Sequence, residues 1–122
     1  MVQTGYHKLK VFQKAKNLVL LIYRVTKKYP RGEQFSLISQ MRRAAISVVA
    51  NIVEGYSRGS TKEYIRFLNI AIGSATELKV YLEISLDLSY LNDKNDSEAN
   101  PLLEEVLKLL YSYRGALMLS CS

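Results

Sequence analysis

The stretch QMRRAAISVVANIVEGYSRGS, residues 40–60, decides the fold because its polar and apolar residues follow separate helical stripes. At about 100° per residue, the apolar side chains gather on one side of a helix and the polar ones on the other. Gly55 and Gly59 are natural helix stops, so a core helix is predicted over residues 36–56. The polar ladder on this helix consists of Gln40, Arg43, Ser47, Asn51, Glu54 and Arg58.

The polar ladder has three interpretations: a hydrogen-bond network that fixes helix register, a subunit interface, or an active site. Neighbours at steps of three and four can bond one another, which favours the network. Catalysis needs a poised acid or base, an activated nucleophile, or a metal. The chain has one histidine, His7, near its terminus, and no Glu-x-x-His pairing or glycine-rich phosphate loop. The sequence therefore predicts a protein that is not an enzyme and that needs no cofactor or metal.

Outward from this stretch, a first helix is predicted over residues 9–29 and a third over residues 61–88. The first helix ends at Pro30. The third opens with Ser60 as its N-cap and Glu63 three residues later, the pattern of a capping box. The buried stripe of the first helix is predicted to contain Val11, Ala15, Leu18, Ile22, Val25 and Tyr29.

A fourth helix is predicted over residues 101–119, after a polar loop over residues 92–101. Asn100 would cap it, and Pro101 suits a first helical position. Four helices with short connections predict an all-α, up-down-up-down antiparallel four-helix bundle, with residues 1–122 as a single domain.

Cellular location is predicted from hydropathy and cysteine usage. No apolar run reaches the ~18 residues of a membrane span, and the N-terminal residues lack the apolar core of a signal peptide. The single cysteine, Cys121, cannot form an internal disulfide, which fits a reducing compartment. We therefore expect a cytoplasmic protein with no membrane partner.

The outward side of the third helix mixes polar and apolar residues in a way that a monomer would not favour. Glu63, Arg66, Gly73 and Glu77 share this side. Exposed apolar residues beside them indicate contact with another chain. The predicted contact residues are Ile70, Val80 and Ile84.

Charge is distributed unevenly along the chain, whose formal net charge is +6. Residues 1–62 hold 12 Lys and Arg against 2 acidic residues, whereas residues 63–122 hold 5 against 9. The basic half is interpreted as a face for an anionic partner such as RNA or DNA, as a surface complementary to another copy, or as a solvated face. The predicted phosphate contacts are Lys10, Lys14, Arg24, Lys27, Lys28 and Arg31.

Residues 40–60 and the following KEYIRFLNIAIGSATEL resemble the family of 23S rRNA intervening-sequence proteins. The family pattern is Gln-x-x-Arg-Ala-x-x-Ser-x-x-x-Asn-Ile-x-Glu-Gly, then Gly-Ser, then Phe-Leu-x-x-Ala-x-Gly-Ser-x-x-Glu-Leu. It falls here on Gln40, Arg43, Ala44, Ser47, Asn51, Ile52, Glu54, Gly55, Gly59, Ser60, Phe67, Leu68, Ala71, Gly73, Ser74, Glu77 and Leu78. The first predicted helix, with its aromatic-Pro end, is also similar to that of the family.

The resemblance implies a four-helix bundle that assembles as a ring-like homopentamer in bacteria. A similar protein, the accessory variability protein of diversity-generating retroelements, is a basic pentamer that binds nucleic acid and a reverse transcriptase. The function expected here is non-enzymatic binding of structured RNA. The alternative is a scaffold for a polypeptide partner such as a polymerase or reverse transcriptase.

The family motif includes most of the polar ladder and contains no recognisable catalytic arrangement. We therefore interpret the motif most simply as a set of residues that specifies packing and assembly. Glu54 and Glu77 are expected to meet Arg43 or Arg66, within or between chains. If the Glu54 pair is buried, Glu54→Ala should destabilise the fold or assembly by about 3 kcal/mol.

Overall fold

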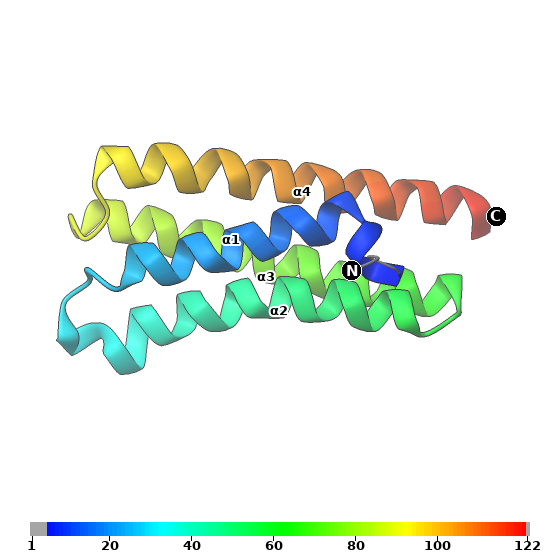
Figure 1. Ribbon diagram of the computed structural model, residues 1–122, viewed down its shortest axis with the longest axis horizontal. Helices are drawn as coiled ribbons and strands as arrows, with labels where there is room; N and C mark the ends of the chain where they lie inside the picture. The colour runs from blue at the N-terminus through cyan, green and yellow to red at the C-terminus, as the bar shows by residue number, and fades with distance from the viewer. Residues whose placement is uncertain (1–4, 122) are drawn as a thin grey trace.

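A computed structural model of the protein describes residues 5–121, with the side chain of Cys121 outside the described set. Four α-helices run up, down, up and down as a bundle, and no strand occurs within the described range (Figure 1). They are α1 (Lys10–Thr26), α2 (Ser39–Ser57), α3 (Thr61–Asp87) and α4 (Asp93–Cys121). The predicted all-α class is confirmed.

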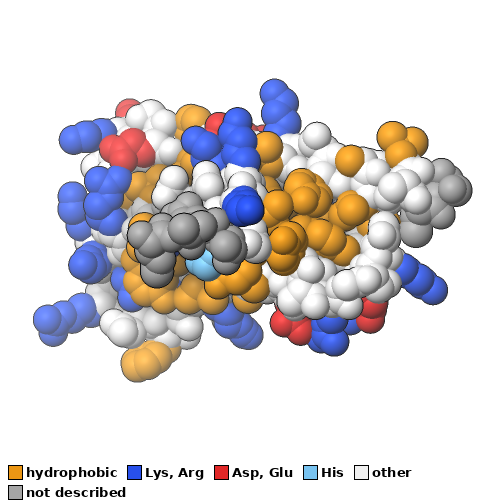
Figure 2. Space-filling view, turned by 45° about the vertical axis from the view of Figure 1, so that its right-hand side comes forward, with side chains coloured by type: hydrophobic (Ala, Val, Ile, Leu, Met, Phe, Trp, Pro, Cys, Tyr) orange, Lys and Arg blue, Asp and Glu red, His pale blue; other side chains and the backbone are white. Residues whose placement is uncertain are grey.

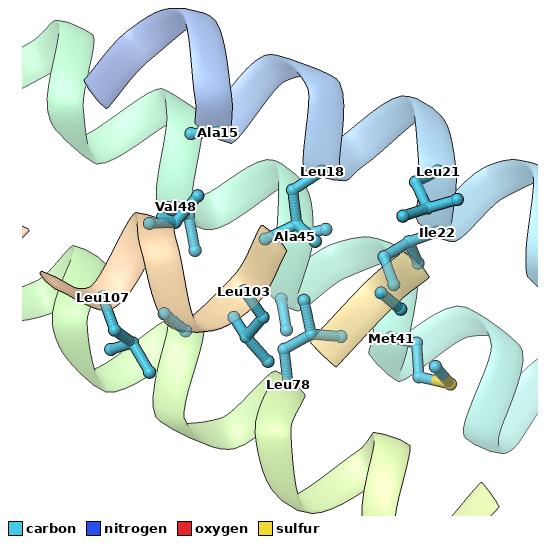
Figure 3. Packing of buried hydrophobic residues seen from close by; sticks show 14 of the residues in the cluster. Ala15, Leu18, Leu21, Ile22, Met41, Ala45, Val48, Leu78, Leu103 and Leu107 are labelled. Carbon is cyan, nitrogen blue, oxygen red and sulfur yellow. The ribbon is translucent and has the colours of Figure 1, made fainter. Parts of the chain in front are cut away.

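The core lies between the four helices and is built from an apolar stripe of each, including the predicted stripe of the first helix. Figure 3 shows Leu18 and Ile22 of α1 pointing toward Met41 and Ala45 of α2 and Leu78 of α3. Leu103 of α4 completes this layer and is fully buried. Each such Leu or Ile contributes roughly 1.5–3 kcal/mol by leaving water, so the stripes supply most of the driving force for the bundle.

The first connection begins earlier than predicted, because α1 ends at Thr26 rather than at residue 29. The Thr26 hydroxyl is buried and donates to the Ile22 carbonyl oxygen at 2.7 Å. Tyr29 precedes a proline, which disfavours helical backbone there. The buried ring of Tyr29 instead packs on Tyr90, with ring centroids 5.6 Å apart. A 3₁₀ turn (Arg31–Glu33) and a π-helical turn (Gln34–Ile38) then lead into α2.

The α2–α3 turn follows the predicted chemistry in part. Gly59 has a φ of +73°, the left-handed conformation that glycine adopts without strain. The Ser60 hydroxyl accepts a hydrogen bond from the backbone N–H of Glu63, as an N-cap should. The Glu63 carboxylate, however, accepts from Arg66 Nε at 2.7 Å. The predicted N-cap is thus present, and the glutamate of the predicted capping box is held by an arginine.

The predicted start of the fourth helix at Pro101 is wrong, because α4 begins at Asp93 and contains Pro101 in its interior. The Asn92 side-chain oxygen accepts from the backbone N–H of Asn95 at 2.8 Å and caps the helix. Asp93 and Asp96 lie in the first turn, where negative charge is favourable. Pro101 is exposed, so water can reach the carbonyl group that loses its helical donor.

Candidate functional site

The polar ladder of α2 forms a half-buried hydrogen-bond network only at its centre. The Ser47 hydroxyl lies 2.8 Å from the Ser74 hydroxyl of α3. Asn51 Nδ2 donates to the Ser47 carbonyl oxygen at 2.8 Å and to the Ser47 hydroxyl at 3.1 Å. These three residues tie α2 to α3 between the two core stripes. Ser47 and Asn51 therefore take part in a hydrogen-bond network of the predicted kind, whereas Gln40 and Arg43 are exposed. That the network fixes helix register stays a prediction.

The expected pairing of the motif glutamates with Arg43 or Arg66 does not occur within the chain. Glu54 pairs with Arg58 at 2.6 Å, and both side chains are about half exposed, at 49% and 47%. Neighbours four residues apart on a solvated helix face pair more readily than residues on different helices. Glu77 instead accepts from the Tyr81 hydroxyl at 2.8 Å.

The Arg66 side chain contacts residues of its own helix, α3, and not the predicted partner on α2. Its Nε donates to Glu63, and this hydrogen bond lowers the pKa of the Glu63 carboxyl. Its guanidinium carbon lies 4.4 Å from the centroid of the Phe67 ring, a cation–π distance. Arg66 therefore covers the start of α3 and contributes to no buried ion pair among the described residues.

Close packing against α3 explains why residue 55 is a glycine, and the sequence alone did not reveal this. A Cβ atom at this position would lie 2.9 Å from both Phe67 Cβ and Tyr64 Cδ1. The end of α2 can thus approach the start of α3 only without a side chain at residue 55. Gly73 is different, since it is exposed and a Cβ atom there would meet nothing within 4 Å. Nothing within the described chain requires glycine at residue 73.

The six predicted phosphate contacts do not form one surface. Lys14 pairs with Glu105 of α4 at 3.0 Å, and Arg24 pairs with Glu98 of α4 at 2.5 Å. Both cations are therefore partly neutralised. Lys10 begins α1, roughly 25 Å along the helix from Lys27, so these two cannot share a phosphate.

The remaining cations gather where α1 ends and α2 begins. Sequence reasoning missed Arg42 among them and predicted Arg43 as part of the polar ladder, not as a phosphate contact. Lys27, Lys28 and Arg31 are exposed around this turn. Arg42 approaches the same end of α1, because its Nε donates to Thr26 Oγ1 at 2.9 Å. None of these residues has an ion pair among the described residues. We call the following set the basic end: Lys27, Lys28, Arg31, Arg42 and Arg43.

Figure 2 shows Lys and Arg side chains gathered on the left-hand part of one face of the molecule, with exposed hydrophobic side chains to the right of centre. The predicted contact residues of α3 are exposed, Ile70 by 41%, Val80 by 48% and Ile84 by 40%. Their exposure agrees with the sequence prediction, whereas their contact with another chain stays a prediction. A second apolar surface lies between α1 and α2 and is lined by Lys16, Val19, Leu20, Ile46, Val49 and Ala50.

Among the side chains that the structure describes, no group of three or more His, Cys, Asp or Glu residues is placed to hold a metal ion. No helix within residues 5–121 is long and apolar enough to cross a bilayer. The site is best described as a cationic surface next to two apolar surfaces.

Residues 7–112 match the family model described as 23S rRNA-intervening sequence protein. The chain belongs to the 23S rRNA-intervening sequence protein family. A crystal structure of a protein of unknown function from the S23 ribosomal protein family, from Bacteroides thetaiotaomicron VPI-5482, is similar to it. That protein is 27% identical, with a TM-score of 0.79 over 86% of this chain and 95% of its own. No curated protein matches the chain.

The chain therefore shares its fold with a solved structure of the S23 ribosomal protein family. Membership of the 23S rRNA-intervening sequence protein family is compatible with a nucleic-acid-associated role. The described motif residues of this family member are explained chiefly by packing, as for Gly55, Ser47 and Asn51. Of the residues of the basic end, only Arg43 also belongs to that motif, and Arg43 is exposed to solvent.

Proposed function

We propose that this protein binds structured RNA through the basic end and catalyses no reaction. The observation that carries the proposal is the concentration of cations without acidic partners at one end of the bundle, on a chain whose family is named for an rRNA sequence. Lys14 and Arg24 are paired within the chain and contribute less. A single cysteine in the sequence supports a reducing, cytoplasmic setting for this role.

Phosphate binding at the basic end has a simple physical basis. Exposed Lys and Arg side chains replace the counterions that surround a nucleic-acid backbone, and the released ions drive binding. Arg43 adds a planar guanidinium, which matches phosphate geometry better than an ammonium group does. Binding of this kind weakens steeply with salt and carries little sequence information.

The test is fluorescence anisotropy with an rRNA hairpin, a DNA duplex and single strands, at low and near-physiological salt. Reversal of two charges, Lys27→Glu with Lys28→Glu, should weaken binding and reduce the salt slope by about 0.7–0.9 for each phosphate that is no longer bound. The matched control is Lys62→Glu with Lys108→Glu, two exposed lysines outside the basic end. Equal losses of affinity in both variants, or weak binding to every probe, would contradict the proposal.

We further propose that copies of the protein assemble as a ring, with five subunits as the family resemblance implies. Two different apolar surfaces are exposed, one on α3 and one between α1 and α2. A head-to-tail contact between unlike surfaces produces a ring when the rotation closes, whereas a two-fold dimer pairs a surface with itself. Gly73, open to solvent on α3, would let a neighbouring backbone approach closely.

Light scattering after size exclusion tests the ring. Val80→Glu with Ile84→Glu should reduce the solution mass to that of a monomer, because charge would be buried at the contact. Met118→Glu, at another exposed apolar residue, should leave the mass unchanged. A wild-type monomer would instead favour the second candidate function, a scaffold whose apolar α3 surface docks a polypeptide such as a polymerase or reverse transcriptase.

A further inference from the structure

Phe35 is the most exposed large apolar side chain of the described residues, with 95% of its surface in contact with solvent. It lies in the π-helical turn that leads into α2, four residues after Arg31. An aromatic ring left in water forgoes a substantial hydrophobic stabilisation. Neither the core nor the family motif accounts for an exposed aromatic side chain at this position.

Phe35 stands between two grooves of different charge. The groove on its α1 side is about 440 Å³ in volume. Its other lining residues are the apolar or aromatic Tyr23, Ile38 and Ile46 and the polar Gln34, Ser39, Arg42 and Arg43. The described residues that line this groove include no carboxylate. The groove on the α3 side contains Glu33, whose carboxylate accepts from the hydroxyls of Ser36 and Tyr90. An anionic ligand would therefore enter the groove on the α1 side.

Arg42 is held in position in this groove by uncharged partners. Its Nε donates to Thr26 Oγ1, its Nη2 donates to the Tyr23 carbonyl oxygen at 3.4 Å, and its guanidinium carbon lies 4.5 Å from the Tyr23 ring centroid. These contacts restrict the side chain without neutralising its charge. A preorganised guanidinium loses less entropy when it binds an anion. Arg43, next in sequence, lines the same groove and is exposed.

We propose that this groove binds one unpaired nucleotide of an RNA loop, with the base stacked on Phe35 and its phosphate held by Arg42 and Arg43. The proposal rests on the RNA-binding function proposed above and specifies its substrate as RNA with an unpaired base beside a helix. Gln34 and Ser39 line the same groove and supply hydrogen-bonding groups for the edge of the base. Proteins commonly recognise unpaired bases by stacking on an aromatic ring beside a cationic groove.

The charges of the groove favour a nucleotide over an apolar peptide. A peptide that covered Phe35 with aliphatic side chains would also cover two guanidinium groups and would have to supply carboxylates to both. A nucleotide supplies a planar apolar face and an anionic phosphate within one small unit. Lys27, Lys28 and Arg31 then extend the same cationic surface toward the adjoining phosphates.

The experiment compares two RNA probes of identical stem sequence, a hairpin with an unpaired purine loop and a blunt duplex without one. Affinity is measured by anisotropy for the wild type, Phe35→Ala, Phe35→Tyr and Met118→Ala. Phe35→Ala should bind the hairpin roughly 5- to 150-fold more weakly, the usual range for the loss of one stacked base, and should bind the duplex as the wild type does. Phe35→Tyr keeps a stacking ring and should retain hairpin affinity. Met118→Ala controls for loss of an exposed apolar side chain elsewhere.

Phe35→Trp provides a direct readout, because the chain contains no tryptophan. A base stacked on the new indole should quench its emission when the hairpin is added and not when the duplex is added. Thermal melting should be unchanged in every Phe35 variant, since the side chain is almost fully exposed.

Equal hairpin affinities of the wild type and Phe35→Ala, with no quenching in Phe35→Trp, would overturn the nucleotide site while leaving backbone binding by the basic end intact. Quenching by an acidic amphipathic peptide and not by the hairpin would also overturn it, in favour of a protein ligand. Failure of the proposed RNA-binding function is distinguishable, because the wild type would then show no salt-dependent binding to either RNA probe.

Discussion

The hydroxyl of Ser47 on α2 lies 2.8 Å from the hydroxyl of Ser74 on α3, and this hydrogen bond joins the two helices. Ser74→Ala should lower the free energy of unfolding by about 1 kcal/mol, the usual net value of one hydrogen bond. A double-mutant cycle with Ser47→Ala, followed by urea denaturation, measures the coupling between the two hydroxyls. Additive effects of the two substitutions would contradict a direct bond.

Gly55 and Gly73 should respond to alanine in opposite ways. Gly55→Ala should destabilise the protein by about 1–3 kcal/mol, because the new Cβ would overlap Phe67 and Tyr64. Gly73→Ala should stabilise an isolated subunit by about 0.5–1 kcal/mol, since the position is open and alanine favours helix. Urea denaturation measures both, and a fall in solution mass for Gly73→Ala would indicate a subunit contact there.

The substitution Glu54→Ala tests whether the Glu54 carboxylate makes only a surface ion pair or is buried in a contact with another subunit. Within the chain the carboxylate makes an exposed pair with Arg58, so its loss should cost only about 0.3–0.5 kcal/mol. The larger cost of about 3 kcal/mol expected from the motif would require burial of Glu54 against another subunit. Denaturation and light scattering on the same samples distinguish the two, and the large loss would have to be accompanied by a reduced mass.

Pro101→Ala should stabilise the protein by about 1–2 kcal/mol. The substitution restores a donor for the carbonyl group of Ser97 and removes a steric conflict in the interior of α4. Part of the gain is offset because proline also restricts the unfolded chain. A melting temperature equal to or below that of the wild type would show that the helix depends on proline at this position.

Tyr29 should make the protein sensitive to alkaline pH. Burial raises the pKa of its hydroxyl above the usual 10.0, and the nearby Ser85 hydroxyl opposes this by a smaller amount. No hydrogen bond of ordinary geometry reaches the Tyr29 hydroxyl oxygen. A group with a raised folded pKa contributes stability that is complete below pH 10 and is lost as pH rises through the folded value. Tyr29→Phe should therefore flatten the loss of stability above pH 10.

At neutral pH, Tyr29→Phe should also add about 1 kcal/mol, because an unpaired buried hydroxyl is removed. Tyr90→Phe is the matched control, since the Tyr90 hydroxyl donates to Glu33 at 3.0 Å and its removal should reduce stability. Denaturation curves from pH 7 upward test both variants, and identical pH profiles for Tyr29→Phe and the wild type would refute the role of Tyr29.

Residues that obey helical periodicity could be predicted from the sequence, and those that depend on neighbours across the bundle could not. The stripe from Val11 to Val25 is buried as expected. The prediction of a helix start at Pro101 was wrong because proline occurs both at helix starts and, where it is exposed, inside helices. The cap that marks the true start is Asn92, nine residues earlier. In the candidate site, Arg42 and Phe35 were missed. The helical wheel places Phe35 on the same outward side as Ile46, a signal that could have flagged an exposed ring.

The sequence by itself determined the helical class, the core stripes, the N-cap at Ser60 and the placement of Ser47 and Asn51 on one polar stripe of α2. These features follow from backbone geometry and from which residues leave water, and both are local properties. Only the tertiary structure decided which charges remain available. Glu105 and Glu98 of α4 neutralise Lys14 and Arg24, whereas Thr26 fixes Arg42 without neutralising it. Pairing between side chains so far apart in the sequence depends on how the helices pack, and no periodicity in the chain encodes it.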